Sequence, residues 1–348
     1  MTHSRQWLGS AATMLTGLAV TIVLPQVADA FEVMQYTLYV VLGIFTLSLA
    51  YIWGLGGILC FGQGAFFGLG GYTFAIVAIN MNETTAALVT AIAIAAATAA
   101  ALGYFMFYGR LSDVYMGVVT LVFTLIIWKL INATAGPEYA IGSARLGGFN
   151  GIPSVPPLNV PGDPGQPFDP VAVFYIACAF LIGVYIFLKL IQVSRFGRLS
   201  VAVKENEVRA ALLGYDVRLI KLLVFTIGGA IAGLAGALYA AYQSFIDPNA
   251  FSLEMSAKVL IWVMAGGVGT FVGPLLACFG LQALSIWIST LPWANSLLIL
   301  GGILCFVVMV LPKGLLPGIA DLLTWAMAAL RRRPADAATV PATEGERA

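Results

Sequence analysis

The chain has 348 residues, of which 60% are hydrophobic and 9% are charged, and its formal net charge is +1. Soluble domains carry roughly 25% charged residues, so this composition excludes an ordinary water-soluble domain and requires lipid as the solvent for much of the surface. The near-zero net charge gives no electrostatic basis for binding nucleic acid. The single histidine, His3, lies in the N-terminal tail, and the four cysteines lie in apolar runs, so we expect no metal site and no disulfide.

Apolar runs long enough to cross the hydrocarbon core, which takes about 20 residues, follow one another along the chain. The first, from Leu8 to Leu24, imitates a secretory signal that ends at Ala28–Asp29–Ala30. It is longer than a usual signal core, so we expect an uncleaved span. We predict an all-α bundle of about ten spans (range 8–10), near residues 7–25, 33–53, 60–81, 84–108, 114–133, 171–192, 219–242, 255–271, 273–291 and 296–312.

Three polar segments lie between or after these spans. Residues 134–170 are rich in Pro and Gly, residues 194–218 are densely charged, and we expect the polar tail 331–348 to be disordered. With the N-terminus in the cytoplasm, only three of the 17 basic residues fall outside, and this asymmetry satisfies the positive-inside rule. We therefore predict one transmembrane domain over 1–330, with both termini and the 194–218 loop in the cytoplasm and the 134–170 loop on the periplasmic side.

The charged loop 194–218 predicts one short helix on the cytoplasmic surface. From Leu199 to Leu213 it contains no Pro or Gly and many strong helix formers, and Gly214 supplies a stop. The helix could lie on lipid or dock into another protein. Its apolar face, near Val201 and Val208, is narrow and carries no Trp or Phe, and its charges have both signs. These features favour docking into a protein groove.

Several Gly-rich and charged motifs follow one another along the chain. They are GLGGILCFGQGAFFGLGGYTF at 54–74, GGFNGIP at 147–153, EVRAALLG at 207–214, GGAIAGLAGALYA at 228–240 and GGVGTFVGP at 266–274. As a set, over roughly residues 35–318, they resemble the permease subunits of ABC importers of the branched-chain amino acid type.

This resemblance implies a location in the bacterial inner membrane and an assembly with other subunits. The expected partners are a homologous permease subunit, two ABC ATPase subunits and a periplasmic substrate-binding protein. The charged helix would then be the coupling helix that docks on the ATPase. The residues assigned to this contact are Arg198, Lys204, Glu205, Glu207, Arg209, Ala210, Ala211 and Gly214.

The chain has no phosphate-binding loop. No Gly–Lys dipeptide occurs in the sequence, which excludes a GxxxxGK[ST] motif. We therefore expect no cofactor and no enzymatic activity in this chain, with ATP and Mg²⁺ bound by the partner ATPase.

Two sets of residues are candidates for packing and for transport. Glycines at helical spacing let helix backbones approach closely in a membrane, and they are Gly64, Gly68, Gly71, Gly229, Gly233 and Gly236. Polar and aromatic residues near the Gly-loosened spans are candidates for the translocation pathway, although ordinary helix packing explains them as well. They are Gln63, Phe66, Phe67, Thr124 and Gln243.

The favoured function is the permease subunit of an ATP-driven importer that moves branched-chain amino acids by alternating access. An alternative within the same class is a permease for urea or short amides. An ion-coupled carrier that acts alone is disfavoured because the spans carry almost no ionisable residue near mid-membrane. A membrane enzyme is disfavoured because the sequence contains no catalytic cluster.

Overall fold

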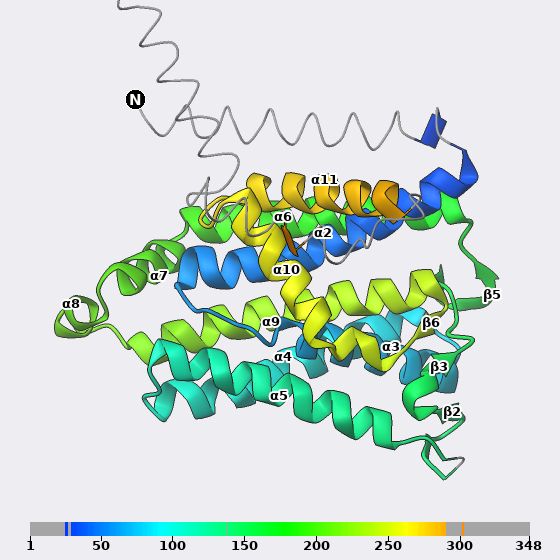
Figure 1. Ribbon diagram of the computed structural model, residues 1–348, viewed down its shortest axis with the longest axis horizontal. Helices are drawn as coiled ribbons and strands as arrows, with labels where there is room; N and C mark the ends of the chain where they lie inside the picture. Colours follow the sequence, from blue (N-terminus) through cyan, green and yellow to red (C-terminus); the bar gives the residue numbers. More distant parts are fainter. Residues whose placement is uncertain (1–24, 27–28, 137, 290–300, 303–348) are drawn as a thin grey trace, which may run out of the picture.

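The computed structural model describes residues 25–26, 29–136, 138–289 and 301–302 of the chain. Within these residues, seven helices are long and apolar enough to cross a membrane. They lie alongside one another as a bundle (Figure 1), in agreement with the predicted class of polytopic helical protein. Their bounds are α2 Ala30–Gly56, α3 Gln63–Met81, α4 Thr84–Tyr108, α5 Asp113–Ala133, α6 Pro170–Val193, α9 Val217–Gln243 and α11 Val272–Ser289.

The described residues give seven spans where the sequence predicted ten. Seven predicted spans coincide with these helices to within three residues at each end. The predicted spans 7–25 and 296–312 lie outside the described residues, apart from positions 25 and 301–302. The remaining prediction, 255–271, is corrected by the structure, because the helix in that region is too short.

That helix is α10, Leu253–Gly266, which has 14 residues. It rises about 21 Å at 1.5 Å per residue, well short of the roughly 30 Å hydrocarbon core. The chain turns at Gly267, whose φ of +102° suits only glycine. The backbone of Gly266 then lies directly against Gly273 at the start of α11. The apolar run therefore contains a helix and a turn rather than a full span.

The start of α3 also differs from the prediction, because residues 57–62 are not helical. Helix α2 ends at Gly56 and is capped by Gly57, which has a left-handed φ of +68°. Non-helical backbone at membrane depth is tolerated where protein covers it. Here α5 provides the cover, because the Thr120 hydroxyl accepts a hydrogen bond from the Phe61 N–H at 3.2 Å. A side chain at Gly62 would overlap the Thr120 carbonyl.

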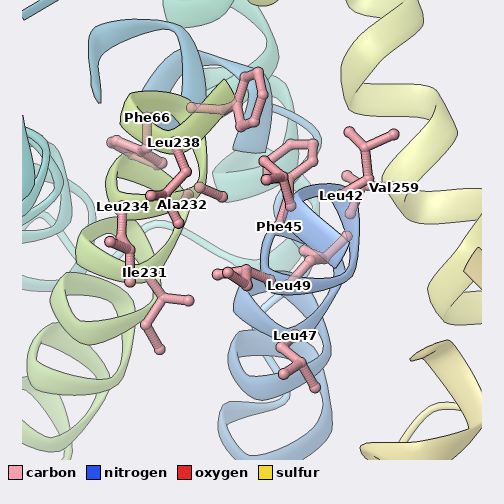
Figure 2. Close-up of a cluster of buried hydrophobic side chains, with 14 of the residues drawn as sticks. Leu42, Phe45, Leu47, Leu49, Phe66, Ile231, Ala232, Leu234, Leu238 and Val259 are labelled. Atoms are coloured by element: carbon pink, nitrogen blue, oxygen red, sulfur yellow. The ribbon is translucent and has the colours of Figure 1, made fainter. Parts of the chain in front are cut away.

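Helix α2 forms the centre of the bundle. The most apolar 18-residue stretch of α2 is 89% buried, whereas the corresponding stretch of α5 is 22% buried. Figure 2 shows Phe45 and Leu49 of α2 between this helix and side chains of α9 such as Leu234, and Leu42 next to Val259 of α10. Helices α4, α5 and α6 carry many exposed apolar side chains. These outer helices therefore present the apolar surface that lipid would cover.

One end of the bundle carries the short strands and is called here the strand end (Figure 1). Strand β3, Ile152–Pro153, pairs antiparallel with β6, Phe245–Ile246, so the long loop is joined to the end of α9. The loop also contacts the start of α4 through hydrogen bonds between Thr84 and Asn159. The other elements here are β1 Ala140–Ile141, β2 Ala144–Arg145, β4 Asn159–Val160, β5 Asp163–Pro167 and the 3₁₀ helices η1 Gly148–Asn150 and η2 Pro248–Phe251.

The opposite end, called here the α8 end, carries the charged loop (Figure 1). The sequence predicted one helix there, and the structure has two: α7, Arg195–Glu205, and α8, Glu207–Leu212. They are separated at Asn206, which is extended (φ −159°, ψ 101°). Its side-chain oxygen accepts a hydrogen bond from the Arg209 N–H at 2.8 Å. Asn is a strong N-cap residue, so it ends one helix and begins the next.

Candidate functional site

The α7–α8 segment (residues 195–212) exposes apolar side chains at its tip. Val208 is 70% exposed and Leu212 is 83% exposed. The face that packs inward is a different one, formed by Val203 and Ala210 against Ile220 of α9. The tip is therefore an apolar surface that no described residue covers.

The segment is attached to α2 through Lys204. The Lys204 ammonium donates a hydrogen bond to the Gly54 carbonyl at 2.9 Å, in the last turn of α2. Its aliphatic stem lies against Gly57, where an added Cβ would be 2.8 Å from the Lys204 Cγ. A cation at the C-terminus of a helix is stabilised by the helix dipole and satisfies a free carbonyl. The side chain that the sequence assigned to an external contact thus binds the central helix of its own chain.

A second attachment connects α8 to α9 and α5 through Lys221. The Lys221 side chain is nearly buried, forms an ion pair with Glu207, and lies 3.7 Å from an Asp113 carboxylate oxygen. These three residues are called here the joint. Glu207 and Lys221 of the joint line an open cavity of about 320 Å³ together with Phe107 and Val208. Movement of α8 would therefore be transmitted through these contacts to the start of α9 and of α5.

The other predicted coupling residues lie on the surface of the α8 end, except for Ala210, which is buried. Gly214 has a φ of +87° and open space around the position where a Cβ would lie. The backbone conformation, and not packing, therefore favours glycine at this position. The exposed members of the set are Arg198, Lys204, Glu205, Glu207, Arg209, Ala211 and Gly214.

The glycines singled out in α3 and α9 lie at helix contacts. Gly71 of α3 meets the Gly236 carbonyl of α9, where an added Cβ would be 3.0 Å from the oxygen. Gly70 meets the backbone of Gly233, and a Cβ there would overlap it. These four glycines are called here the glycine seam. The remaining predicted positions face Ser256 from Gly64, Phe251 from Gly68 and Ala99 from Gly229.

Gln63 lies fully buried at the point where α3 begins. Its amide nitrogen donates to the Ser48 hydroxyl at 2.8 Å and lies 3.4 Å from the Gly228 carbonyl. The Ser48 hydroxyl donates its own hydrogen to the Phe45 carbonyl, so it can only accept from Gln63, which fixes the orientation of the amide. The Gln63 carbonyl oxygen accepts no hydrogen bond from the described residues. A buried polar atom without a hydrogen-bond partner costs free energy, so its presence here calls for an explanation.

The family of the chain follows from comparison with known proteins. Residues 33–310 match the family model described as "Branched-chain amino acid transport system / permease component". The chain belongs to this family. It is therefore a multi-pass membrane permease and not a catalytic enzyme, and the resemblance noted in its motifs is confirmed.

Individual relatives of this permease are transport proteins of several cargo classes. It is 32% identical over 302 residues to the high-affinity branched-chain amino acid transport system permease protein LivM of Escherichia coli (strain K12), covering 80% of this chain and 68% of LivM. It is 31% identical over 216 residues to the ribose import permease protein RbsC of the same strain, covering 60% of this chain and 61% of RbsC. No solved structure matches this chain.

The candidate pathway residues of the permease do not form one site. Phe66 is buried in the core with its ring edge-on to Phe225 at 5.4 Å, and the Thr124 hydroxyl bonds the Thr120 carbonyl one turn away. Phe67 packs at 5.3 Å from Tyr239 and lines a cavity toward the strand end. Gln243 is exposed at the last turn of α9, where its side chain interacts with Tyr239.

The residues that sequence reasoning missed are those whose partners lie far along the chain. Lys221 and Asp113 of the joint were treated only as charges on one side of the membrane. A signal was present for Lys221, because it interrupts the apolar face of a predicted span, and a buried lysine needs a carboxylate partner. No signal in the sequence identified Gly54 as the partner of Lys204.

Proposed function

We propose that this permease is the membrane subunit of an ATP-driven importer of branched-chain amino acids. Support for the cargo comes from the family description and from the relative LivM, which shares 32% identity over 80% of this chain. The observation that carries the proposal for ATP-driven coupling is the α7–α8 segment. It presents an uncovered apolar tip and is attached inward at two separate points, through Lys204 and through the joint.

The proposed assembly contains two ABC ATPase subunits, a homologous permease subunit and a periplasmic substrate-binding protein. ATP and Mg²⁺ are bound by the ATPases, and the α7–α8 tip docks on one of them. The α8 end faces the cytoplasm. Support for this orientation is the excess of basic residues at the α8 end, namely Arg110, Lys189, Arg195, Arg198, Lys204, Arg209, Arg218 and Lys221.

The proposed mechanism is alternating access driven by the ATPases. Binding of ATP favours one arrangement of the ATPase pair, and the docked tip moves with it. The Lys204 contact then carries this movement to the end of α2, and the joint carries it to the start of α9. Helices α2 and α9 pack against each other in the core, so a change in their relative position opens the bundle at one end or the other.

The test is transport by proteoliposomes that contain the whole assembly. We expect uptake of labelled leucine against its gradient with ATP and the binding protein, and no uphill movement by the permease alone. Labelled urea and ribose, added in separate samples, are expected to give no uptake. Uptake of urea or ribose without leucine would overturn the proposed cargo, and uphill transport by the permease alone would overturn the ATP-driven mechanism.

The role of the α7–α8 segment is tested by reversing its charges. We expect the double variant Glu207→Lys with Arg209→Glu to hydrolyse ATP while losing at least about tenfold in leucine uptake, because the joint is broken and the docking surface inverted. The matched control is Glu138→Lys, a charge reversal in the loop at the strand end. Equal loss in both variants, or normal uptake in the double variant, would contradict the coupling role.

A further inference from the structure

A cavity of about 170 Å³ lies next to β6, where the strand end meets α3, α9 and the start of α10. Its lining includes two carboxylates, an ammonium group and two aromatic residues. We infer that this cavity is a binding site for a zwitterionic amino acid with an apolar side chain. The inference rests on the proposed function, which it deepens by naming where the permease itself recognises its cargo.

The anionic part of the site is Asp247, which follows β6. One Asp247 carboxylate oxygen accepts a hydrogen bond from the Asn249 side-chain amide at 2.6 Å, which fixes the orientation of the carboxylate. A carboxylate has about four acceptor positions, so the other oxygen remains able to accept from a ligand. The fitting ligand group is an ammonium, because charge-assisted hydrogen bonds of this kind are the strong ones.

The cationic part of the site is Lys258, in the second turn of α10. Its ammonium lies 2.8 Å from a Glu254 carboxylate oxygen, and this ion pair holds the long side chain in one place. A lysine ammonium has three donors, so two remain for a ligand. The fitting ligand group is a carboxylate, which the dipole at the nearby N-terminus of α10 also stabilises. Together with Asp247, the wall thus offers both charges that a zwitterion needs.

The aromatic part of the lining suits an aliphatic side chain. It comes from Tyr239 and Phe67, whose ring centroids lie 5.3 Å apart. The volume holds roughly a dozen water-sized groups at 10–15 Å³ each, which fits a single amino acid rather than a peptide. The sequence had proposed Phe67 for the pathway, and here it has a defined ligand group to contact.

The position of the cavity suits transport as well as binding. Phe67 is also the residue whose carbonyl meets Gly236, so the cavity lies directly at the glycine seam between α3 and α9. The charged groups are partly exposed, with side-chain exposures of 36% for Lys258 and 55% for Glu254. Partial solvation keeps binding weak, and a transport site must bind weakly enough to release its cargo.

The chemistry of the wall also separates amino acids from the other cargoes of this class. Ribose and urea carry no charge, so neither satisfies Asp247 and Lys258, and each would leave both charged groups without a ligand partner. A site built to bind polar groups rejects an analogue that lacks them. The cavity therefore favours the amino acid cargo over sugars and amides.

The first test measures ligand binding to the complete transporter in nanodiscs, with the binding protein omitted. We expect leucine to bind, and leucinamide, which lacks the carboxylate, and 4-methylvalerate, which lacks the ammonium, to bind at least about tenfold more weakly. Asp247→Asn should weaken the binding of leucine by a similar factor and leave the binding of 4-methylvalerate unchanged. Lys258→Met should weaken the binding of leucine and leave the binding of leucinamide unchanged. The control Glu138→Gln, outside the cavity, should bind leucine as the wild type does.

Several outcomes overturn the site. They are no leucine binding to the wild type at millimolar concentration, equal binding of urea or ribose, or unchanged leucine binding in Asp247→Asn and Lys258→Met. A folding defect is recognised by ATP hydrolysis of each variant without substrate, and the conservative variant Lys258→Arg should retain binding. The second test is uptake with the binding protein present. If the wild type imports leucine and both variants import it with unchanged KM and kcat, the proposed function stands and this site falls. If the wild type does not import leucine, the proposed function falls instead.

Discussion

Helix α9 is held by two unlike contacts, and their comparison separates what must stay fixed from what can move. Near its start the joint binds it to α8 and α5 through the charges of Lys221, Glu207 and Asp113. Along its middle the glycine seam binds it to α3 by backbone approach, as at Gly236. The joint is directional and partly solvated, whereas the seam is buried and formed by the close approach of glycine backbones.

The difference assigns different tolerances to the two contacts. In the seam there is no room for a methyl group, so any larger residue must push the helices apart. In the joint, long side chains reach across a gap, so a change of side chain alters communication more than folding. Mutations in the seam should therefore lower the stability of the fold. Mutations in the joint should instead weaken the coupling between ATP hydrolysis and uptake.

The largest expected effect is in the seam, from Gly236→Ala. A Cβ at this position would overlap the Phe67 carbonyl, so we expect a loss of about 3 kcal/mol in the free energy of unfolding, at the upper end of overpacking costs. The measurement is thermal unfolding of the purified protein in detergent.

The matched control for this substitution is Gly183→Ala in α6. Its added Cβ meets nothing within 4 Å, and alanine is the better helix former. We expect this variant to be as stable as the wild type or slightly more stable. Equal melting temperatures for the two variants would show that the seam is looser than its geometry indicates.

The seam also marks how far the sequence could be interpreted. Glycine spacing, a local pattern, indicated that α3 and α9 pack closely against other elements. It did not identify the partners, because Gly64 faces Ser256 of α10 and Gly233 faces Ala95 of α4. The same local reasoning gave seven spans to within three residues. It failed at α10, where the apolar run continues through the turn at Gly267 and hydropathy cannot distinguish a helix from a buried turn.

The joint was beyond such reasoning for a different reason. Its residues lie on three elements, and nothing local indicates that α5, α8 and α9 meet at one end. The break at Asn206, by contrast, had a local signal, since Asn followed by Glu is a common start of a helix. It was outweighed by the helix formers on both sides, and the cost was a single predicted helix where two exist.

The second expected effect is in the joint, from Lys221→Met. The two carboxylates lose their partner, but Glu207 and Asp113 are exposed enough to be solvated, so we expect a change in stability within about 1 kcal/mol. Leucine taken up per ATP hydrolysed should fall at least about tenfold, because α8 can then move without α9. The measurement is the ratio of uptake to ATP hydrolysis in proteoliposomes.

Asp113→Asn is the matched comparison within the joint. Its oxygen lies 3.7 Å from the Lys221 ammonium and its side chain is 68% exposed, so we expect less than a twofold change in the same ratio. If Lys221→Met kept the wild-type ratio, the joint would be an incidental surface pair. If Asp113→Asn had the larger effect, α5 rather than α8 would be the important partner of Lys221.

The third expected effect is at Gln63, where a polar contact reaches the middle of α9. Gln63→Leu removes a buried oxygen that has no described partner and replaces it with a side chain of similar size. We expect the free energy of unfolding to stay within about 1 kcal/mol, because removing an unsatisfied polar group offsets the lost bond to Ser48.

Transport should nevertheless fall several-fold in this variant. The Gln63 amide is positioned to exchange its bonds to Ser48 and Gly228 when α2 and α9 shift. The apolar side chain that replaces it in the variant forms no hydrogen bond with either helix. Gln63→Asn, which keeps the amide but shortens it, serves as the comparison and should retain part of the uptake. If Gln63→Leu transports like the wild type while remaining stable, the polar contact only fixes packing, and movement of α9 depends on the joint alone.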